Sequence, residues 1–152
     1  MKVSALQRDG IGLLALDEAY LVAESLGLTL DEPTNAENLN ALLARFISLY
    51  SEYTTGIVLD PTYSLPLLEH KHKNSGLALR IEQERDQDPL SVPRFIPQWG
   101  IEDVRNNYGV AKLELYYHPA EEMAAEKKKL VADLFDFCQY EGIDFLLKLV
   151  IY

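Results

Sequence analysis

Short apolar runs alternate with longer segments of helical periodicity along this chain, and that order restricts the folds open to it. The apolar runs lie at residues 11–17, 56–61, 76–82, 110–117 and 143–152. Strands separated by helical segments are typical of βαβ units, in which neighbouring strands run parallel. The sequence therefore predicts an α/β fold with five strands in a parallel sheet.

Apolar residues at three- and four-residue spacing predict the helices between these runs. Helices are expected at 18–26, 39–53, 101–108 and 119–141. Pro119 suits the first turn of the last helix, and Gly142 suits its end. The segment 83–99 contains three prolines and many charges without a clear period, so a surface loop is expected there.

Two architectures fit this order of elements. One is a doubly wound sheet of five strands, and the other is a (β/α)8 barrel interrupted after its fifth strand. A complete barrel needs about 250 residues, whereas this chain has 152 and stops inside its last apolar run. We therefore expect residues 1–152 to form a single incomplete barrel domain, a parallel sheet with an open edge.

Charge and cysteine content exclude several classes of function. Fourteen basic and twenty-four acidic residues give a formal charge of −10, which disfavours binding to nucleic acid or anionic membranes. The single cysteine, Cys138, cannot form an internal disulfide. No signal peptide or membrane-spanning run is recognisable in the sequence. We expect a cytoplasmic protein.

Polar residues within the apolar runs mark the candidate site. Because strand side chains alternate between faces, Lys112 and Glu114 share one face of their strand, and Lys148 stands in mid-strand on the corresponding face of the last one. The opposite faces are expected to be covered by helices, and in the last strand this face consists of Phe145, Leu147, Leu149 and Ile151. Asp17 and Asp60 each close an apolar strand at its carboxyl end, where α/β folds place their chemistry.

These residues admit a catalytic and a structural interpretation. A buried lysine with a lowered pKa is the nucleophile that forms a Schiff base with a carbonyl compound. Alternatively, Lys112 and Lys148 pair with Glu114 and the aspartates or lie on an exposed edge. Asp17 and Asp60 are equally suited to capping a turn or helix. The spacing alone leaves these alternatives open.

Other polar groups favour structural roles. His70 and His72 are two residues apart, without acidic or cysteine partners at ligand spacing, so a solvated loop is expected rather than a metal site. The lysines 127–129 are expected on the exposed face of their helix. No glycine-rich phosphate loop, nucleophile elbow or zinc signature is present, so no metal or organic cofactor is expected.

Three segments together resemble a known family. They are GIVLDPTY at 56–63, KLELYYHP at 112–119 ahead of a glutamate-rich helix, and FLLKLVIY at 145–152. These segments resemble the tagatose-1,6-bisphosphate aldolase family, and the second also resembles the aldolases of inositol catabolism. The resemblance runs from about Gly12 to Tyr152 and follows the order of the first five barrel strands of that family.

The resemblance implies a class I aldolase, a (β/α)8 barrel that cleaves a ketose phosphate through a lysine Schiff base without a metal. Asp17 matches the acidic residue at the end of the first strand, which contacts substrate and handles protons. Lys112 matches the fourth-strand lysine that helps to bind substrate and stabilise charge. Lys148 is the third candidate catalytic residue.

The sequence departs from the family pattern at three places. Glu18 and Ala19 follow Asp17, where the family usually has a Gln-Arg pair. Lys148 stands where the fifth strand normally offers a glutamate as general acid or base. The Schiff-base lysine of the family belongs to its sixth strand, beyond Tyr152, so we expect this chain alone to be inactive as an aldolase.

Two hypotheses of different classes follow. The chain is the N-terminal part of an aldolase that binds a sugar phosphate substrate, or it is a non-catalytic α/β half-barrel module that self-associates or binds a sugar phosphate. A third hypothesis makes Lys112 or Lys148 a relocated Schiff-base lysine. An open sheet edge exposes backbone groups and apolar surface, so a homo-oligomer or a complementary barrel half is the expected partner.

Overall fold

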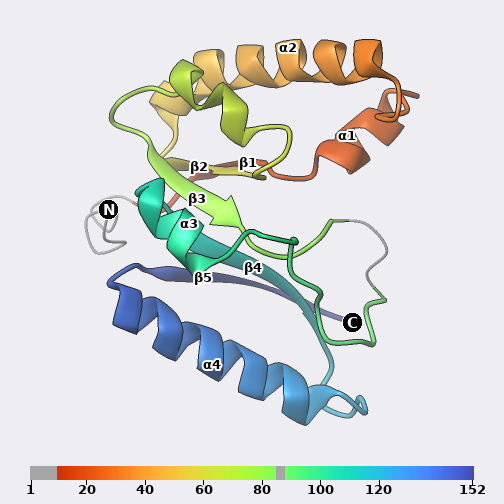
Figure 1. Ribbon diagram of the computed structural model, residues 1–152, viewed down its shortest axis with the longest axis vertical. Coiled ribbons are helices and arrows are strands. Elements are labelled where there is room, and N and C mark those ends of the chain that lie inside the picture. Colours follow the sequence, from red (N-terminus) through yellow and green to blue (C-terminus); the bar gives the residue numbers. More distant parts are fainter. Residues whose placement is uncertain (1–9, 85–87) are drawn as a thin grey trace. The chain divides into compact units, whose positions relative to one another are not determined.

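Strands and helices alternate through residues 10–84 and 88–152, which the computed structural model describes (Figure 1). The contacts within the chain divide it between Leu79 and Arg80. Among the described residues, 10–79 form an N-terminal unit, and Arg80 to Tyr152 form a C-terminal unit. The single domain expected over 1–152 stays a prediction.

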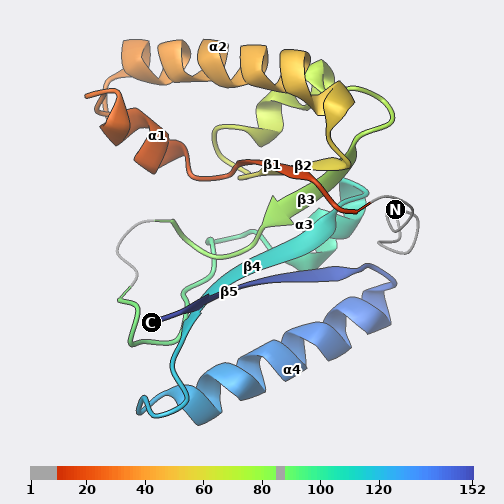
Figure 2. The ribbon, with the colours of Figure 1, turned by 180° about the vertical axis from the view of Figure 1, so that it is seen from behind.

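The N-terminal unit contains three parallel strands and the helices between them. Its elements are β1 (Leu13–Leu16), α1 (Ala19–Ser25), α2 (Pro33–Tyr50), the 3₁₀ helices η2 (Ser51–Tyr53) and η3 (Leu65–His70), β2 (Gly56–Leu59) and β3 (Gly76–Arg80), whose last residue begins the next unit. Leu14 pairs with Ile57, and Ile57 pairs with Leu77. Figure 2 shows α2 running alongside β1 and β2.

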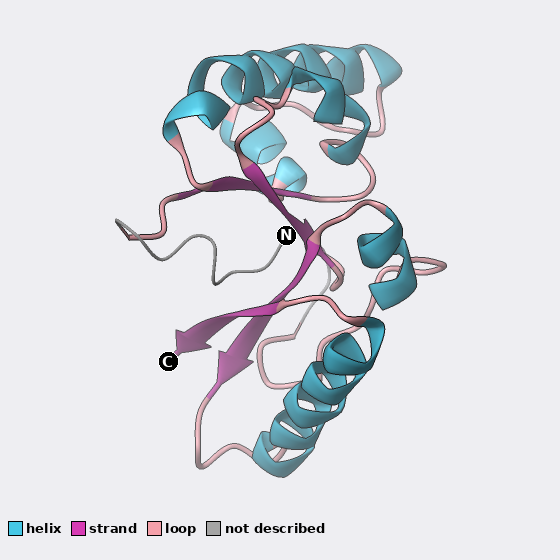
Figure 3. Ribbon diagram, turned by 90° about the vertical axis from the view of Figure 1, so that its left-hand side faces the viewer, coloured by secondary structure: helices cyan, strands magenta, loops and turns pink. Residues whose placement is uncertain are grey.

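The C-terminal unit contains two parallel strands with a long helix along them. Its elements are α3 (Ile101–Asn106), β4 (Val110–Tyr117), α4 (Ala124–Glu141) and β5 (Phe145–Ile151). β4 and β5 pair over seven residues, from Ala111 opposite Phe145 to Tyr117 opposite Ile151. In Figure 3, α4 follows these two strands, which it contacts on one face.

The sheet confirms the fold class expected from the sequence. Its strand order is β1-β2-β3-β4-β5, so the spatial order follows the chain order. The pairs β1/β2, β2/β3 and β4/β5 are all parallel. Parallel strands that stay in chain order, with helices in the connections, are the arrangement of the first five strands of a (β/α)8 barrel.

The helix boundaries follow from local sequence. Pro33 occupies the first turn of α2, where its missing N–H removes no helical hydrogen bond. Leu39, Leu43 and Ile47 lie four residues apart and are buried, so α2 presents one apolar stripe to the core. Gly142 ends α4 with φ of 71°, a left-handed conformation that glycine adopts without strain.

The last helix begins later than the sequence suggested. Pro119 lies in a turn before α4, which starts at Ala124, so the first-turn role predicted for this proline is wrong. In that turn, the carboxylate of Glu121 accepts a hydrogen bond from the backbone N–H of His118 at 3.2 Å. A side-chain contact therefore holds the chain between β4 and α4 in the turn.

The prediction that helices cover one face of β5 is also wrong in part. Leu113 and Leu115 in β4 are buried, as expected of a face that a helix covers. The corresponding residues of β5 are not, since Leu149 is 46% and Ile151 is 71% exposed. Within the described residues β5 pairs only with β4, so it lies at an edge and has fewer neighbours to bury it.

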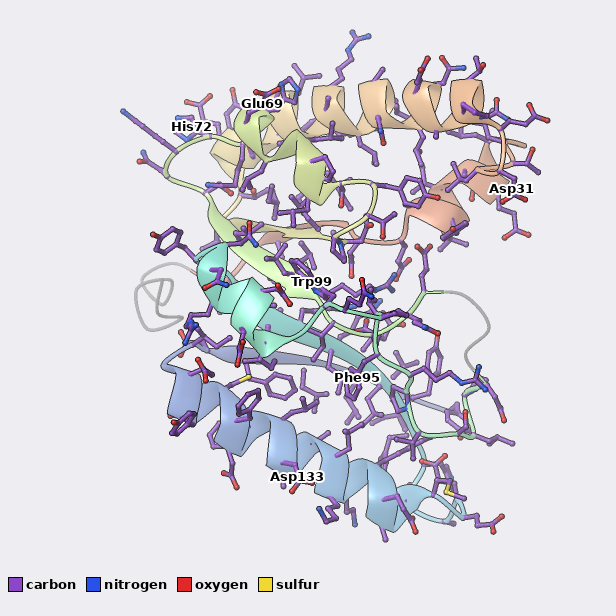
Figure 4. All side chains as sticks on the ribbon, viewed as in Figure 1. Asp31, Glu69, His72, Phe95, Trp99 and Asp133 are labelled. Carbon is purple, nitrogen blue, oxygen red and sulfur yellow. The ribbon has the colours of Figure 1, made fainter. Side chains whose placement is uncertain are left out.

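The segment after β3 packs back on that strand. Glu82 and Phe95 form an antiparallel bridge, and the indole N–H of Trp99 donates to the carbonyl oxygen of Arg80 at 2.9 Å. Figure 4 labels Phe95 and Trp99 on this segment. The expected loop is therefore anchored at both of these places, and its described residues, 83–84 and 88–99, contain no helix.

No helix among the described residues combines the length and apolar character needed to cross a membrane. Cys138 is a free thiol on the buried side of α4, where desolvation raises its pKa to about 11. Such a thiol is protonated at neutral pH and behaves as a small apolar side chain.

Candidate functional site

Lys112 is buried in the middle of β4, with 4% of its side chain exposed. Its ammonium nitrogen lies 2.9 Å from Oε1 of Glu82 and 3.5 Å from Oε2 of Glu114. A buried ammonium group is stable only when carboxylates compensate its charge, and these two carboxylates do so.

Lys148 reaches the same carboxylate from the neighbouring strand. It lies opposite Glu114 in the register of β4 and β5, and its Nζ is 2.7 Å from Oε2 of Glu114. Paired residues of parallel strands point to the same side of a sheet. Lys112 and Lys148 therefore share one face of the sheet, as the alternation of side chains predicted.

A second carboxylate extends the cluster toward β3. Oε1 of Glu82 accepts hydrogen bonds from Nε of Arg80 at 3.0 Å and from Nζ of Lys112 at 2.9 Å. Arg80 also lies 3.5 Å from the carboxylate of Glu84. Arg80, Glu82, Lys112, Glu114 and Lys148 thus form one continuous ionic cluster, which we call the lysine cluster.

The two carboxylates differ in their surroundings. Glu82 is buried, and its Oε2 accepts no hydrogen bond from the part of the chain that the structure describes. Glu114 is nearly buried, whereas its partner Lys148 is half-exposed, with 51% of the side chain accessible to solvent. The lysine cluster therefore extends from the protein interior at Glu82 to solvent at Lys148.

The charges of the cluster act on Glu114. Desolvation by itself would raise the pKa of this carboxyl. The hydrogen bond from Lys148, together with the positive charges of Lys112, Lys148 and Arg80, outweighs that effect and lowers the pKa below its ordinary value. Glu114 is therefore ionised at neutral pH.

Asp17 belongs to the N-terminal unit and directly follows β1, as predicted. Its side chain is buried, with 2% of the residue exposed. Tyr20 and Tyr63 come from the same unit, where their hydroxyl oxygens lie 3.2 Å apart and their rings pack edge to face. The catalytic roles of Asp17, Lys112 and Lys148 stay predictions.

Asp60 serves the turn after β2. Its Oδ1 accepts hydrogen bonds from the backbone N–H groups of Thr62 and Tyr63, each at 2.7 Å. Its Oδ2 accepts from the backbone N–H and the hydroxyl of Ser64 at 3.1 and 2.7 Å. These contacts use both oxygens of Asp60, which supports the structural alternative for this residue.

The histidine-lysine segment also has structural contacts. Nζ of Lys71 donates to the carbonyl oxygens of His72 and Ser75, and the backbone N–H of His72 donates to the hydroxyl of Ser51. Figure 4 labels His72 together with Glu69, which lies 3.8 Å from His70. Across residues 10–84 and 88–152, no group of three or more histidine, cysteine, aspartate or glutamate side chains is arranged to hold a metal ion.

Lys127 forms a second buried contact, contrary to the expectation that it lies on the exposed face of its helix. Its Nζ donates to the carbonyl oxygens of Pro89 and Tyr116 at 2.7 and 2.9 Å and to Oε2 of Glu121 at 2.8 Å. The side chain is 0% exposed. Helical periodicity missed this role because the partners come from a distant loop and a strand end.

Tyr152 completes this second network. Its hydroxyl donates to Oε2 of Glu121 at 2.7 Å, and this bond raises the pKa of Tyr152 to about 12. Desolvation would raise the pKa of Glu121, but the hydrogen bonds from Lys127, Tyr152 and the backbone of His118 lower it. The network ties the turn after β4 to the residue that follows β5.

Sequence reasoning missed Glu82 and Arg80 as members of the lysine cluster and treated Glu114 only as a structural partner. A signal for the first two was present. Arg80 and Glu82 are two residues apart at the end of an apolar run, so they share a face by the same alternation that paired Lys112 with Glu114. What the alternation did not provide was the pairing of that face with β4.

No family model matches the chain. Individual proteins, however, are similar to it in sequence. A tagatose 1,6-diphosphate aldolase of Staphylococcus haemolyticus is 27% identical over 151 residues, which cover 95% of this chain and 46% of the relative. The Staphylococcus aureus and Streptococcus mutans proteins of that function are 32% and 31% identical over 129 residues, 80% of this chain.

The similarity covers most of this chain but only part of each relative. The chain spans 46%, 39% and 38% of the length of these three aldolases. The match therefore supports a distant common origin for the five-stranded segment, and it agrees with the family resemblance seen in the sequence.

Proposed function

Since the chain is a distant homologue of tagatose 1,6-diphosphate aldolases along most of its length, we propose that it carries part of the active site of a class I aldolase. The substrate is a ketose phosphate such as tagatose 1,6-bisphosphate. Cleavage of one carbon–carbon bond yields dihydroxyacetone phosphate and an aldehyde phosphate.

The observation that carries this proposal is the convergence of Lys112 and Lys148 on one oxygen of Glu114. Two ammonium groups side by side can bind the carbonyl oxygen or phosphate of a ketose phosphate and stabilise negative charge that develops during cleavage. In this proposal Lys112 holds the substrate and Lys148 supplies a second positive charge. Asp17 is the proposed proton-handling residue of the first strand.

The proposal predicts that this chain binds dihydroxyacetone phosphate, which can be measured by titration followed with phosphorus NMR. Lys148→Met should weaken binding about tenfold or more, because a hydrogen bond to a charged group contributes about 1.5–3 kcal/mol. Lys129→Met is the matched control, since Lys129 is an exposed lysine of α4 paired only with Asp133 in the described residues. Equal binding by both variants would contradict the proposal.

Borohydride reduction tests whether a Schiff base forms on this chain. The family that the sequence resembles has its Schiff-base lysine on a later strand. We therefore expect no reduced adduct of dihydroxyacetone phosphate on Lys112 or Lys148. Peptide mass mapping that finds an adduct on either lysine would instead establish a relocated Schiff-base lysine.

A second candidate function is a non-catalytic module that self-associates or binds a sugar phosphate. The exposed apolar side chains of β5 favour it, because such surface is commonly covered by another protein. This module would bind dihydroxyacetone phosphate without chemical change. Its partner would be a second copy of the chain or a complementary barrel half.

A further inference from the structure

Glu114 is not among the candidate catalytic residues that the family resemblance implies. It lies in mid-strand on β4, directly opposite Lys148 in β5 and two residues from Lys112 on the same face. Both strands are regular here, so backbone pairing rather than a loop positions the three residues. Groups held by regular strands keep their geometry better than groups on loops.

The two lysines of the cluster differ in exposure. Glu82 and Glu114 both contact the buried Lys112, and Arg80 in turn contacts Glu82. Lys112 is therefore confined between two carboxylates. Lys148 is half-exposed, so a ligand can reach it from solvent while Lys112 keeps its buried contacts with Glu82 and Glu114.

The ionic state of Glu114 suits a proton acceptor. The neighbouring positive charges lower the pKa of this carboxyl, so it carries a negative charge at neutral pH. A ligand that draws Lys148 toward its own carbonyl oxygen or phosphate removes a hydrogen bond from Oε2. The loss of that bond raises the basicity of the carboxylate at the moment when a ligand is bound.

From this geometry we propose that Glu114 is a general base that removes a proton from the carbon next to the carbonyl group of a bound α-hydroxyketone phosphate. The inference rests on the proposed function, since it requires the same ligand at the same lysine cluster. It adds an activity that this chain can perform without a Schiff base, namely enolisation.

The step is balanced within the cluster. The carboxylate of Glu114 takes the proton, the carbon–hydrogen electron pair forms a carbon–carbon double bond, and the carbonyl electron pair moves onto oxygen. The ammonium groups of Lys112 and Lys148 stabilise the resulting enolate. Return of the proton restores the ketone, and in D₂O the returning atom is deuterium, so no further reactant is consumed.

Proton NMR in D₂O tests this inference through the loss of the carbon-bound proton signals of dihydroxyacetone phosphate. The wild-type chain should accelerate the exchange over buffer. Glu114→Gln should lower the rate about 10²-fold or more, because general base catalysis contributes about 10²–10⁴-fold. Glu114→Asp keeps a carboxylate with a shorter reach and should retain measurable exchange. Glu126→Gln, an exposed glutamate of α4, should exchange at the wild-type rate.

Binding is measured in parallel by phosphorus NMR, and the fold of each variant by circular dichroism. A wild-type chain that binds the ligand but causes no exchange overturns the role of Glu114 and leaves the proposed function standing. Absence of both binding and exchange overturns both. Unchanged exchange in folded Glu114→Gln, or complete loss in folded Glu114→Asp with normal exchange in Glu126→Gln, also contradicts the assignment.

Discussion

A lysine in the middle of a strand is stable there only when carboxylates compensate its charge, and Lys112 has two such neighbours. Glu114 comes from its own strand, at the two-residue spacing visible in the sequence. Glu82 follows β3 and lies thirty residues away in the chain. The first contact is local and was predicted as one of the alternatives for Lys112, whereas the second depends on how the strands pair.

The lowered pKa of Glu114 predicts a specific dependence of stability on pH. A carboxyl with a lower pKa in the folded state contributes stability above its unfolded pKa, near 4.5, and loses that contribution as the pH falls through its folded value. The difference in unfolding free energy between the wild-type chain and Glu114→Gln should therefore shrink as the pH falls below 4.5.

Urea denaturation at about pH 7 and about pH 3 measures this difference. The exposed substitution Glu126→Gln serves as the control and should show a much smaller change between the two pH values. If Glu114→Gln changed the free energy of unfolding by the same amount at both pH values, the ionised carboxylate would not contribute to stability.

Lys127 provides a prediction about burial. Lys127→Met removes the donor shared by two carbonyl oxygens and the carboxylate of Glu121. We expect the free energy of unfolding to fall by about 1–3 kcal/mol, because acceptors in partly buried positions lose their partner. Denaturation of Lys129→Met provides the comparison, and its effect should stay below about 1 kcal/mol as for other exposed ion pairs. Equal effects of the two substitutions would mean that the buried contacts of Lys127 contribute nothing.

At the scale of elements, β4 and β5 have the same alternating pattern but different surroundings. The apolar face of β4 is covered by α4, whereas part of the corresponding face of β5 is exposed. Alternation fixes which side chains share a face of a strand, but it does not determine how much of that face a neighbouring element covers.

This difference predicts unequal effects of the same substitution on the two strands. Leu113→Ala, at a position that is 0% exposed, should lower the free energy of unfolding by about 2–5 kcal/mol. Leu149→Ala should cost less than about 1 kcal/mol, since an exposed leucine loses little burial. Guanidinium denaturation of the two variants gives both values, and a large loss for Leu149→Ala would indicate that β5 is covered in solution.

At the scale of the whole molecule, the chain matches less than half the length of its aldolase relatives. Leu149 and Ile151 of β5 are exposed, and so is Tyr152, which follows the strand. Edge strands with apolar side chains are the usual sites at which another polypeptide adds to a sheet. The proposed partner, either a second copy of the chain or a complementary barrel half, is therefore expected to bind at β5.

Self-association can be tested with charge introduced at this edge. We expect the wild-type chain to increase in mean mass with concentration in light-scattering chromatography, because association covers apolar surface. Leu149→Lys combined with Ile151→Lys should shift the chain toward the monomer. Leu26→Lys, at an exposed leucine after α1, should leave the distribution unchanged. A monomeric wild-type chain at every concentration would exclude the second copy as partner.

The sequence by itself determined the order of strands and helices, because apolar periodicity is a local property that each segment carries. It also determined that Lys112, Glu114 and Lys148 lie on corresponding faces, since alternation depends only on spacing along a strand. The start of α4 was less well predicted, because Pro119 suits both a turn and a first helical residue.

Tertiary structure alone decided which of these groups meet. The contact of Lys112 with Glu82, the burial of Lys127 and the exposure of Leu149 all depend on segments far apart in the chain. Burial and ionic pairing are set by neighbours in space, and periodicity does not encode which neighbours those are. The same limit explains why Asp17 and Asp60 looked alike in the sequence, although Asp60 uses both carboxylate oxygens to hold its own turn.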